Sequence, residues 1–165
     1  MSVLAVQQLK VFCTRCRQLV DDDHECPIKH RVLLDATLAG VAGRLSDLGL
    51  KPAMATFHFA NTTATTFNLS MSIVLDTQPN FAILGDLPAG WEYGWDGDRV
   101  VSLEYNDCRT CSNSVEAEAR LNEVIEQFEA FLDDKDVEVR RLCCFWRGPN
   151  IRNRSCGQKA TLLDG

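Results

Sequence analysis

Residues 53–75 read AMATFHFANTTATTFNLSMSIVL, and the alternation of apolar and polar side chains in this stretch decides the fold class. Successive side chains of a β-strand point to opposite faces, so a repeat of two residues is typical of strands. One such repeat covers residues 53–59 and another covers residues 67–75, with a threonine-rich stretch between them. We therefore predict two antiparallel strands, and we expect the polar side chains of the second to line a solvent-exposed face.

The residues around the dipeptide Asp96-Gly97 predict a second pair of strands. Residues 91–95 and 99–105 flank this dipeptide, and Asp-Gly between apolar alternations is a strong signal for a tight hairpin turn. Shorter apolar runs at residues 81–84 and 137–145 are expected to add one more strand and an edge strand. The sequence thus predicts an antiparallel sheet of four to five strands.

Two other segments carry the apolar spacing of amphipathic helices. The first begins at His30 and places its apolar side chains on one stripe, at Leu34, Leu38, Val41, Leu45 and Leu48. The second begins after Asn113, a residue type that caps helix N-termini well, and runs to about Asp133. We expect both helices to pack on one face of the sheet, which makes this an α+β fold.

The length of 165 residues suits one domain with short appendages. We expect residues 1–30 to form a zinc-knuckle segment packed on the main domain, residues 31–147 to form the helix-sheet-helix domain, and residues 148–165 to form a basic loop or tail. The start of the chain lacks the pattern of a signal peptide, and no stretch approaches the roughly 20 apolar residues that cross a bilayer. These features predict a cytoplasmic protein with no membrane partner.

Eight cysteines are the most informative residues for function. In a reducing compartment, thiols close in sequence are more often zinc ligands than structural disulfides, although disulfides, redox chemistry and an iron–sulfur cluster stay open as alternatives. The first set is Cys13, Cys16, Cys26 and His30, and we predict that these residues close the tetrahedral shell of a structural zinc ion. His24 is the competing fourth ligand. The alternative to a site is a buried Cys26 thiol with His30 on the surface at a helix start.

The spacing of this first set resembles a treble-clef or zinc-finger-like knuckle, a resemblance that covers residues 13–30 and implies an N-terminal hairpin clamped by zinc. Four protein ligands leave no open coordination position, which catalytic zinc requires. The sequence motifs of zinc deaminases, zincins, serine hydrolases and P-loop proteins are absent. The set therefore predicts a structural site rather than a reaction centre.

A second set of four cysteines is expected to bind a second zinc ion: Cys108, Cys111, Cys144 and Cys156. Adjacent side chains of an extended strand point to opposite sides, so only one of Cys143 and Cys144 is expected to join this site. A different solution unites the two CxxC pairs in one four-thiolate site and leaves Cys26 and His30 out. The cofactor prediction is therefore one or two structural zinc ions.

The acidic run at residues 20–24, Val-Asp-Asp-Asp-His, resembles the start of a His-metal-finger nuclease of the resolvase type. The resemblance implies that Asp21, Asp23 and His24 bind magnesium and activate water. Asp22 stands where that family carries a second histidine. A solvated acidic loop is the simpler interpretation of the same run.

Two groups of side chains are candidates for contact with a partner. Residues 87–92 resemble the first hairpin of a WW domain, although the second signature tryptophan does not follow, and three aromatic residues alternate there: Trp91, Tyr93 and Trp95. These rings are either core residues or an aromatic contact patch. The basic end of the chain supplies Arg147, Arg152 and Arg154, which can contact phosphates or pair with the acidic side of the second helix.

The leading hypothesis is a small intracellular, non-enzymatic binding protein whose zinc-stabilised sheet contacts a protein or nucleoprotein partner. Such a protein would suit a viral role as a phage or mobile-element inhibitor of a host complex. The alternative is a metal-dependent nuclease or nucleic-acid-binding protein that uses Asp21, Asp23 and His24 together with the arginine-rich tail.

Overall fold

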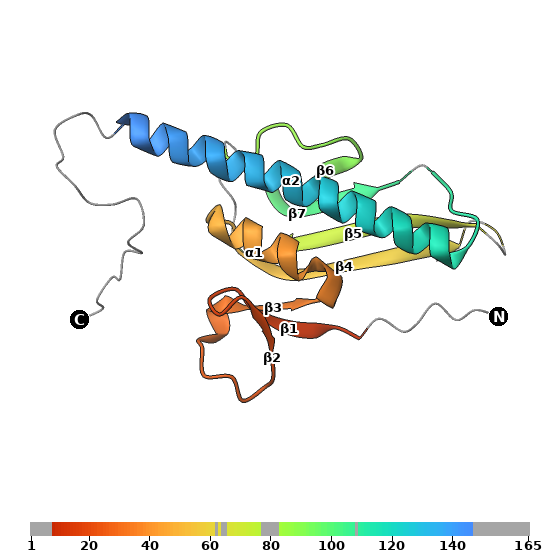
Figure 1. The fold of residues 1–165 in the computed structure, drawn as a ribbon, viewed down its shortest axis with the longest axis horizontal. Coiled ribbons are helices and arrows are strands. Elements are labelled where there is room, and N and C mark those ends of the chain that lie inside the picture. The colour runs from red at the N-terminus through yellow and green to blue at the C-terminus, as the bar shows by residue number, and fades with distance from the viewer. Residues whose placement is uncertain (1–7, 62, 64–65, 77–82, 108, 147–165) are drawn as a thin grey trace.

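The computed structural model describes residues 8–61, 63, 66–76, 83–107 and 109–146. These residues form a mixed α+β fold in which a seven-stranded sheet packs against two α-helices (Figure 1). In chain order, the elements are β1 (Lys10–Cys13), β2 (Gln18–Val20), the short 3-10 helix η1 (Ile28–His30), β3 (Arg31–Leu34), a second 3-10 helix η2 (Ala36–Leu38), α1 (Ala39–Asp47), β4 (Pro52–Asn61), β5 (Phe67–Leu75), β6 (Trp91–Asp96), β7 (Arg99–Asn106) and α2 (Ser114–Trp146).

The strand order across the sheet is β2-β1-β3-β4-β5-β7-β6. Neighbouring strands are antiparallel except for β3 and β4, which run parallel. The prediction of four to five antiparallel strands is therefore wrong in size and in strand direction. The difference arises in the N-terminal segment, where β1 and β2 form the expected hairpin but join the main sheet through β3.

The strand β3 corrects the prediction that the first helix begins at His30. Val32 and Leu34 are buried, whereas Leu33 between them is 42% exposed, which is the two-residue period of a strand. Because Leu34 fits both this alternation and a helical stripe, the apolar spacing alone favoured the wrong element. The helix α1 begins only at Ala39.

The two central hairpins confirm the prediction from sequence periodicity. β4 and β5 pair antiparallel along most of their length, and β6 and β7 pair across the Asp96-Gly97 turn. Gly97 has a φ of 61°, a left-handed conformation that glycine adopts without steric cost. In the expected strand at residues 81–84, residues 83–84 lie in a turn and residues 81–82 fall outside the described part of the chain.

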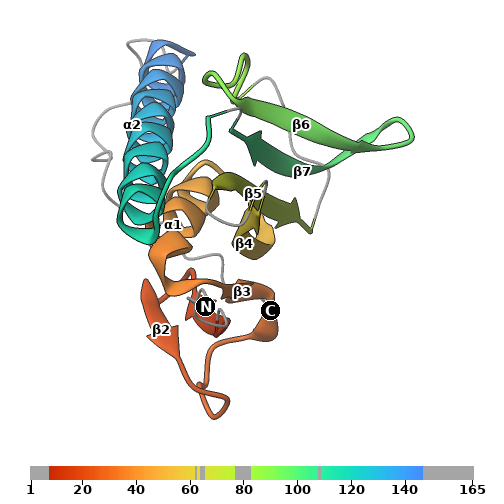
Figure 2. The same ribbon diagram turned by 90° about the vertical axis from the view of Figure 1, so that its right-hand side faces the viewer.

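Both α-helices lie on the same side of the sheet (Figure 2). The indole of Trp91 on β6 stacks on the ring of Phe128 on α2, with 3.8 Å between ring centroids and an interplanar angle of 13°. Alternate side chains of β5 complete the core between the sheet and the helices: Leu69, Met71, Ile73 and Leu75. The intervening residues of β5 therefore point to the face that these helices do not cover.

The helix α2 is longer than expected. Its start agrees with the prediction, because Oδ1 of Asn113 accepts a hydrogen bond of 2.9 Å from the N–H of Glu116. Its end does not, because the helix continues through the expected edge strand at residues 137–145. An ion pair of 2.8 Å between Arg140 and Asp136, four residues apart, supports the helical conformation there.

A buried ion pair fastens α2 to the end of β7. The Arg120 guanidinium lies 2.6 Å from the Asp107 carboxylate, and both side chains are largely buried. Arg120 also donates a hydrogen bond of 3.0 Å to the Tyr105 hydroxyl, and the N–H of Arg109 donates one of 2.8 Å to Asp107. Each charge thus has hydrogen-bonded partners, as a buried ion pair requires.

Truncation of Phe128 tests the helix-sheet core. Phe128→Ala removes a fully buried ring and its stack on Trp91, so we expect the free energy of unfolding to fall by about 3–5 kcal/mol. Val115→Ala is the matched control, because Val115 is 75% exposed on the same helix. Urea unfolding followed by circular dichroism measures both variants, and equal stability of the two would contradict the packing described here.

The buried ion pair predicts a loss of stability in acid. Burial alone would raise the pKa of Asp107, but hydrogen bonds from Arg120 and from the Arg109 N–H outweigh it and hold the pKa below its usual value of 3.8. Because the folded-state pKa is the lower one, the contribution of this carboxylate is complete above the unfolded-state pKa and is lost as the pH falls through the folded value.

Asp107→Asn should therefore lower the free energy of unfolding at pH 7 by about 3 kcal/mol and flatten its decline below pH 4. Urea unfolding between pH 7 and pH 2.5 measures both effects. Asp98→Asn, at an exposed position of the β6–β7 turn, should leave the acid profile unchanged. A wild-type decline retained in Asp107→Asn would refute the assignment.

Candidate metal centre

Two N-terminal segments meet at one end of the sheet: the turn between β1 and β2, and the connection from β2 to β3. The turn is closed by a hydrogen bond of 2.8 Å from the Arg17 N–H to the Cys13 carbonyl. The Thr14 N–H donates a hydrogen bond of 2.8 Å to the His30 carbonyl, which joins the turn to the connection. The Arg31 guanidinium donates to the His24 carbonyl, which holds the connection to the start of β3. These bonds fix the two segments against each other.

Four side chains converge where the segments meet: Cys13, Cys16, His24 and Cys26. Their ligand atoms all lie within 4.8 Å of one another. The Sγ atom of Cys16 lies 3.3 Å from Sγ of Cys26 and 3.5 Å from Nε2 of His24. In a tetrahedral zinc site, with metal–ligand distances near 2.0–2.3 Å, neighbouring ligand atoms are about 3.5–3.8 Å apart. This group could therefore hold one metal ion.

The thiols of this group compete for ionisation. The Cys26 thiol, together with burial and the nearby Cys13, raises the pKa of Cys16 to about 11. Burial also opposes ionisation of Cys13, but hydrogen bonds from the Cys16 N–H and from His24 outweigh it and lower the pKa of Cys13 to about 7. At neutral pH the Cys13 thiolate is thus favoured at the expense of the Cys16 thiolate, and a cation would be needed to hold both ionised.

The fourth member of the group is His24, the residue expected only as an alternative, and not His30. The short helix η1 carries His30 to the end of the connection, where its carbonyl accepts hydrogen bonds from Thr14. The sequence spacing of Cys26 and His30 assumed a regular helix from that point, and this assumption is wrong. The position of His24 depends on the turn after Asp21, whose carbonyl accepts a hydrogen bond of 3.2 Å from the His24 N–H.

The second predicted set of cysteines cannot be assembled from the described residues. Cys108, Cys156 and the side chain of Cys144 fall outside them. Cys111 is buried and its backbone pairs with Phe67 in an isolated bridge. Burial, followed by the nearby Glu116 and Asp107, raises the pKa of the Cys111 thiol and keeps it neutral. The second zinc site stays a prediction.

The aromatic residues of β6 have different environments. Trp91 is buried against Phe128 and belongs to the core, so its ring is not available to a partner. Tyr93 is half-buried, and its hydroxyl donates a hydrogen bond of 2.6 Å to the Gly85 carbonyl. Trp95 is 62% exposed. The expected contact patch thus reduces to Trp95, while Arg147, Arg152 and Arg154 fall outside the described residues.

The face of the sheet opposite the two helices carries an apolar row that the sequence analysis missed. The register of the strands places five residues side by side across β2, β1, β3, β4 and β5: Val20, Val11, Leu33, Met54 and Val74. Leu33 is 42% exposed and Met54 is 36% exposed. The row depends on pairings between distant segments, including the parallel pair of β3 and β4. The one signal in the sequence is the uninterrupted apolar run Val32-Leu33-Leu34, whose middle residue must face away from its neighbours if the run is a strand.

Comparison with known proteins identifies no relative: the chain matches no protein-family model, no curated protein and no solved structure. Among the described helices, none has both the length and the apolar composition that crossing a membrane demands. Function is therefore inferred from side-chain chemistry and from the exposed surfaces.

Replacement of the two histidines separates the alternative ligand sets. His24→Ala should weaken metal binding by more than the roughly 10–100-fold that loss of an outer-shell partner costs, because it removes a direct ligand. His30→Ala is the matched control and should bind metal like the wild type. Titration with Co²⁺, followed by thiolate-to-cobalt absorption and competition with Zn²⁺, measures both affinities. The reverse order of the two variants would restore His30 as the ligand.

Proposed function

We propose that Cys13, Cys16, His24 and Cys26 hold one structural zinc ion. The observation that carries this proposal is the convergence of three sulfur atoms and one imidazole nitrogen within 4.8 Å. Zinc favours thiolate and imidazole ligands, and a three-cysteine, one-histidine set is one of its common structural shells. The CxxC spacing of Cys13 and Cys16 and the competition among the thiols for ionisation support the same ion.

The zinc ion would clamp the N-terminal hairpin to the connection that leads into β3. Its ligands come from Cys13 and Cys16 at the β1–β2 turn and from residues 24–26 of the connection, and a bound ion would join these segments directly. Four protein ligands occupy a tetrahedral shell completely and leave no position for a reactant. We therefore propose that the metal stabilises the fold and takes no part in a reaction.

We further propose that the protein acts by binding a macromolecular partner, a protein or nucleoprotein, through the helix-free face of the zinc-clamped sheet. The apolar row from Val20 to Val74 supports this choice, because its central residues Leu33 and Met54 are exposed and contiguous exposed apolar surface marks contact sites. The partner it fits is a protein surface that presents an apolar ridge. Trp95, exposed near the β6–β7 turn, is a second candidate anchor.

The nuclease alternative gains no specific support. The Nε2 atom of His24 lies 3.5 Å from the Cys16 sulfur, and His24 is a member of the cysteine–histidine group. If this imidazole binds zinc with the cysteines, it does not also serve a magnesium site with Asp21 and Asp23. Asp21 and Asp23 are both exposed. Their placement agrees with a solvated acidic loop.

A partner-capture experiment tests the binding proposal. The zinc-loaded protein is compared with Leu33→Glu/Met54→Glu, which charges the apolar row, and with Val115→Glu/Leu142→Glu, which charges two exposed positions on α2. We expect wild type and the α2 variant to retain the same partner from cells of native origin and the row variant to lose it. Thermal unfolding first establishes that all three are folded.

Equal capture by all three proteins would show that the helix-free face is not the contact surface. A chemical turnover that survives purification and disappears with one side-chain change would instead contradict the non-enzymatic role. Metal analysis of the same samples separates the two proposals, because zinc can be present in a protein whose partner binds elsewhere.

A further inference from the structure

A cavity of about 300 Å³ opens between the end of α1 and the N-terminal strands. Its apolar floor includes Val32 and Leu50, which are almost fully buried. Its polar lining comes from separate parts of the chain: Thr14 in the β1–β2 turn, Lys29 and His30 in η1, Ser46 in α1, and Lys51 just before β4. At this volume the cavity is at the lower end of the range for small-molecule sites.

The charged residues that line this cavity are all basic. Lys29 and Lys51 form no ion pair with any described residue, and no acidic residue lines the cavity. Burial lowers the pKa of His30, and the neighbouring cations Lys29, Arg15 and Lys51 lower it further. Lysines without an ion pair in the lining of a cavity favour an anionic ligand, even in a chain with a net charge of −6.

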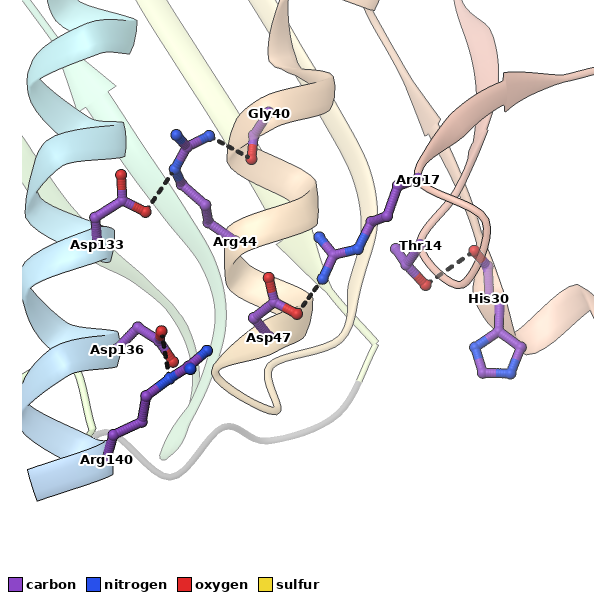
Figure 3. Close-up of polar contacts among 9 residues, drawn as sticks. All are labelled: Thr14, Arg17, His30, Gly40, Arg44, Asp47, Asp133, Asp136 and Arg140. Atoms are coloured by element: carbon purple, nitrogen blue, oxygen red, sulfur yellow. Dashed lines mark hydrogen bonds and ion pairs between the residues drawn. The ribbon is translucent and has the colours of Figure 1, made fainter. Parts of the chain in front are cut away.

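One of the acidic residues next to this lining is already paired. Asp47 follows Ser46 at the end of α1, and its carboxylate accepts a hydrogen bond from the Arg17 guanidinium of the hairpin (Figure 3). Thr14 donates to the His30 carbonyl, which fixes the backbone at the mouth of the cavity (Figure 3). Asp47 is therefore neutralised in place and does not compete with a ligand for the lysines.

The end of α1 also has its backbone groups satisfied. The N–H groups of Leu48, Gly49 and Leu50 donate to the carbonyls of Arg44, Ser46 and Leu45 at 3.0–3.1 Å. The negative end of a helix dipole disfavours an anion only weakly at an exposed position. Hydrogen bonds from two lysine ammonium groups to an anion outweigh this repulsion, because charge-assisted hydrogen bonds are stronger than neutral ones.

We propose that this cavity is a phosphate-binding site. Lys29 and Lys51 bind the phosphate oxygens, the Ser46 hydroxyl donates a further hydrogen bond, and His30 donates from its ring nitrogen. The apolar floor at Val32 and Leu50 accommodates the organic part of a phosphate ester. The phosphate belongs either to a small phosphorylated molecule or to the backbone of a nucleic acid, which share the same recognition chemistry.

Calorimetric titration of the full-length protein tests this site with three probes at low ionic strength: inorganic phosphate, adenosine monophosphate and a single-stranded oligothymidylate. Lys29→Gln/Lys51→Gln removes the two ammonium groups, and Lys10→Gln/Lys135→Gln removes the same charge at exposed or partly exposed positions on β1 and α2. We expect the cavity variant to bind at least tenfold more weakly than wild type and the control variant to bind within twofold of wild type. Amide NMR signals of Gly49 and Leu50 should shift on binding.

The probes distinguish the two sources of the phosphate. Binding of the monophosphate that the oligonucleotide cannot displace supports a small-molecule ligand, whereas displacement by the oligonucleotide supports a nucleic-acid backbone. Equal loss of affinity in both double variants, or no binding of any probe by the wild type, would refute the phosphate-binding site. None of these results depends on the partner proposed for the sheet face.

Discussion

Burial of one face of the sheet beneath α1 and α2 is the constraint on which the rest of the structure depends. The Trp91–Phe128 stack and the alternate residues of β5 fill this interface. Once those positions are committed to the core, the strand period assigns every intervening residue to the opposite face. The row of apolar side chains across β2, β1, β3, β4 and β5 thus consists of residues that alternate with core residues along their strands. The packing that stabilises the fold therefore also determines which side chains lie on the helix-free face.

The N-terminal strands need support that the core does not supply. β1 has four residues and β2 has three, and a ribbon of this size is marginal in water. Phe12 anchors it to the core, and the Arg17–Asp47 pair links its turn to α1. The cysteine–histidine group lies at the same turn. A metal ion at that group would supply cross-links where apolar area is too small.

Local patterns predicted the parts of this protein that local interactions determine. Both central hairpins, the Asn113 cap and three members of the cysteine–histidine group follow from periodicity, turn residues and CxxC spacing. Non-local pairing decided the rest. β3 is a strand because β1 and β4 flank it, and its four residues carry too short a pattern to separate strand from helix. His24 replaces His30 because the chain between Cys26 and β3 forms one 3-10 turn, which no ligand spacing encodes.

The position of the cysteine–histidine group at the margin of the sheet has a consequence for kinetics. β2 is an outer strand, and the group lies where the β1–β2 turn meets the connection to β3, whereas Trp91 lies on β6 at the opposite edge of the sheet. Sub-global opening of marginal strands takes less free energy than global unfolding. A metal ion held by this group would therefore load and leave through openings that the helix-covered core does not share, and its exchange would not require global unfolding.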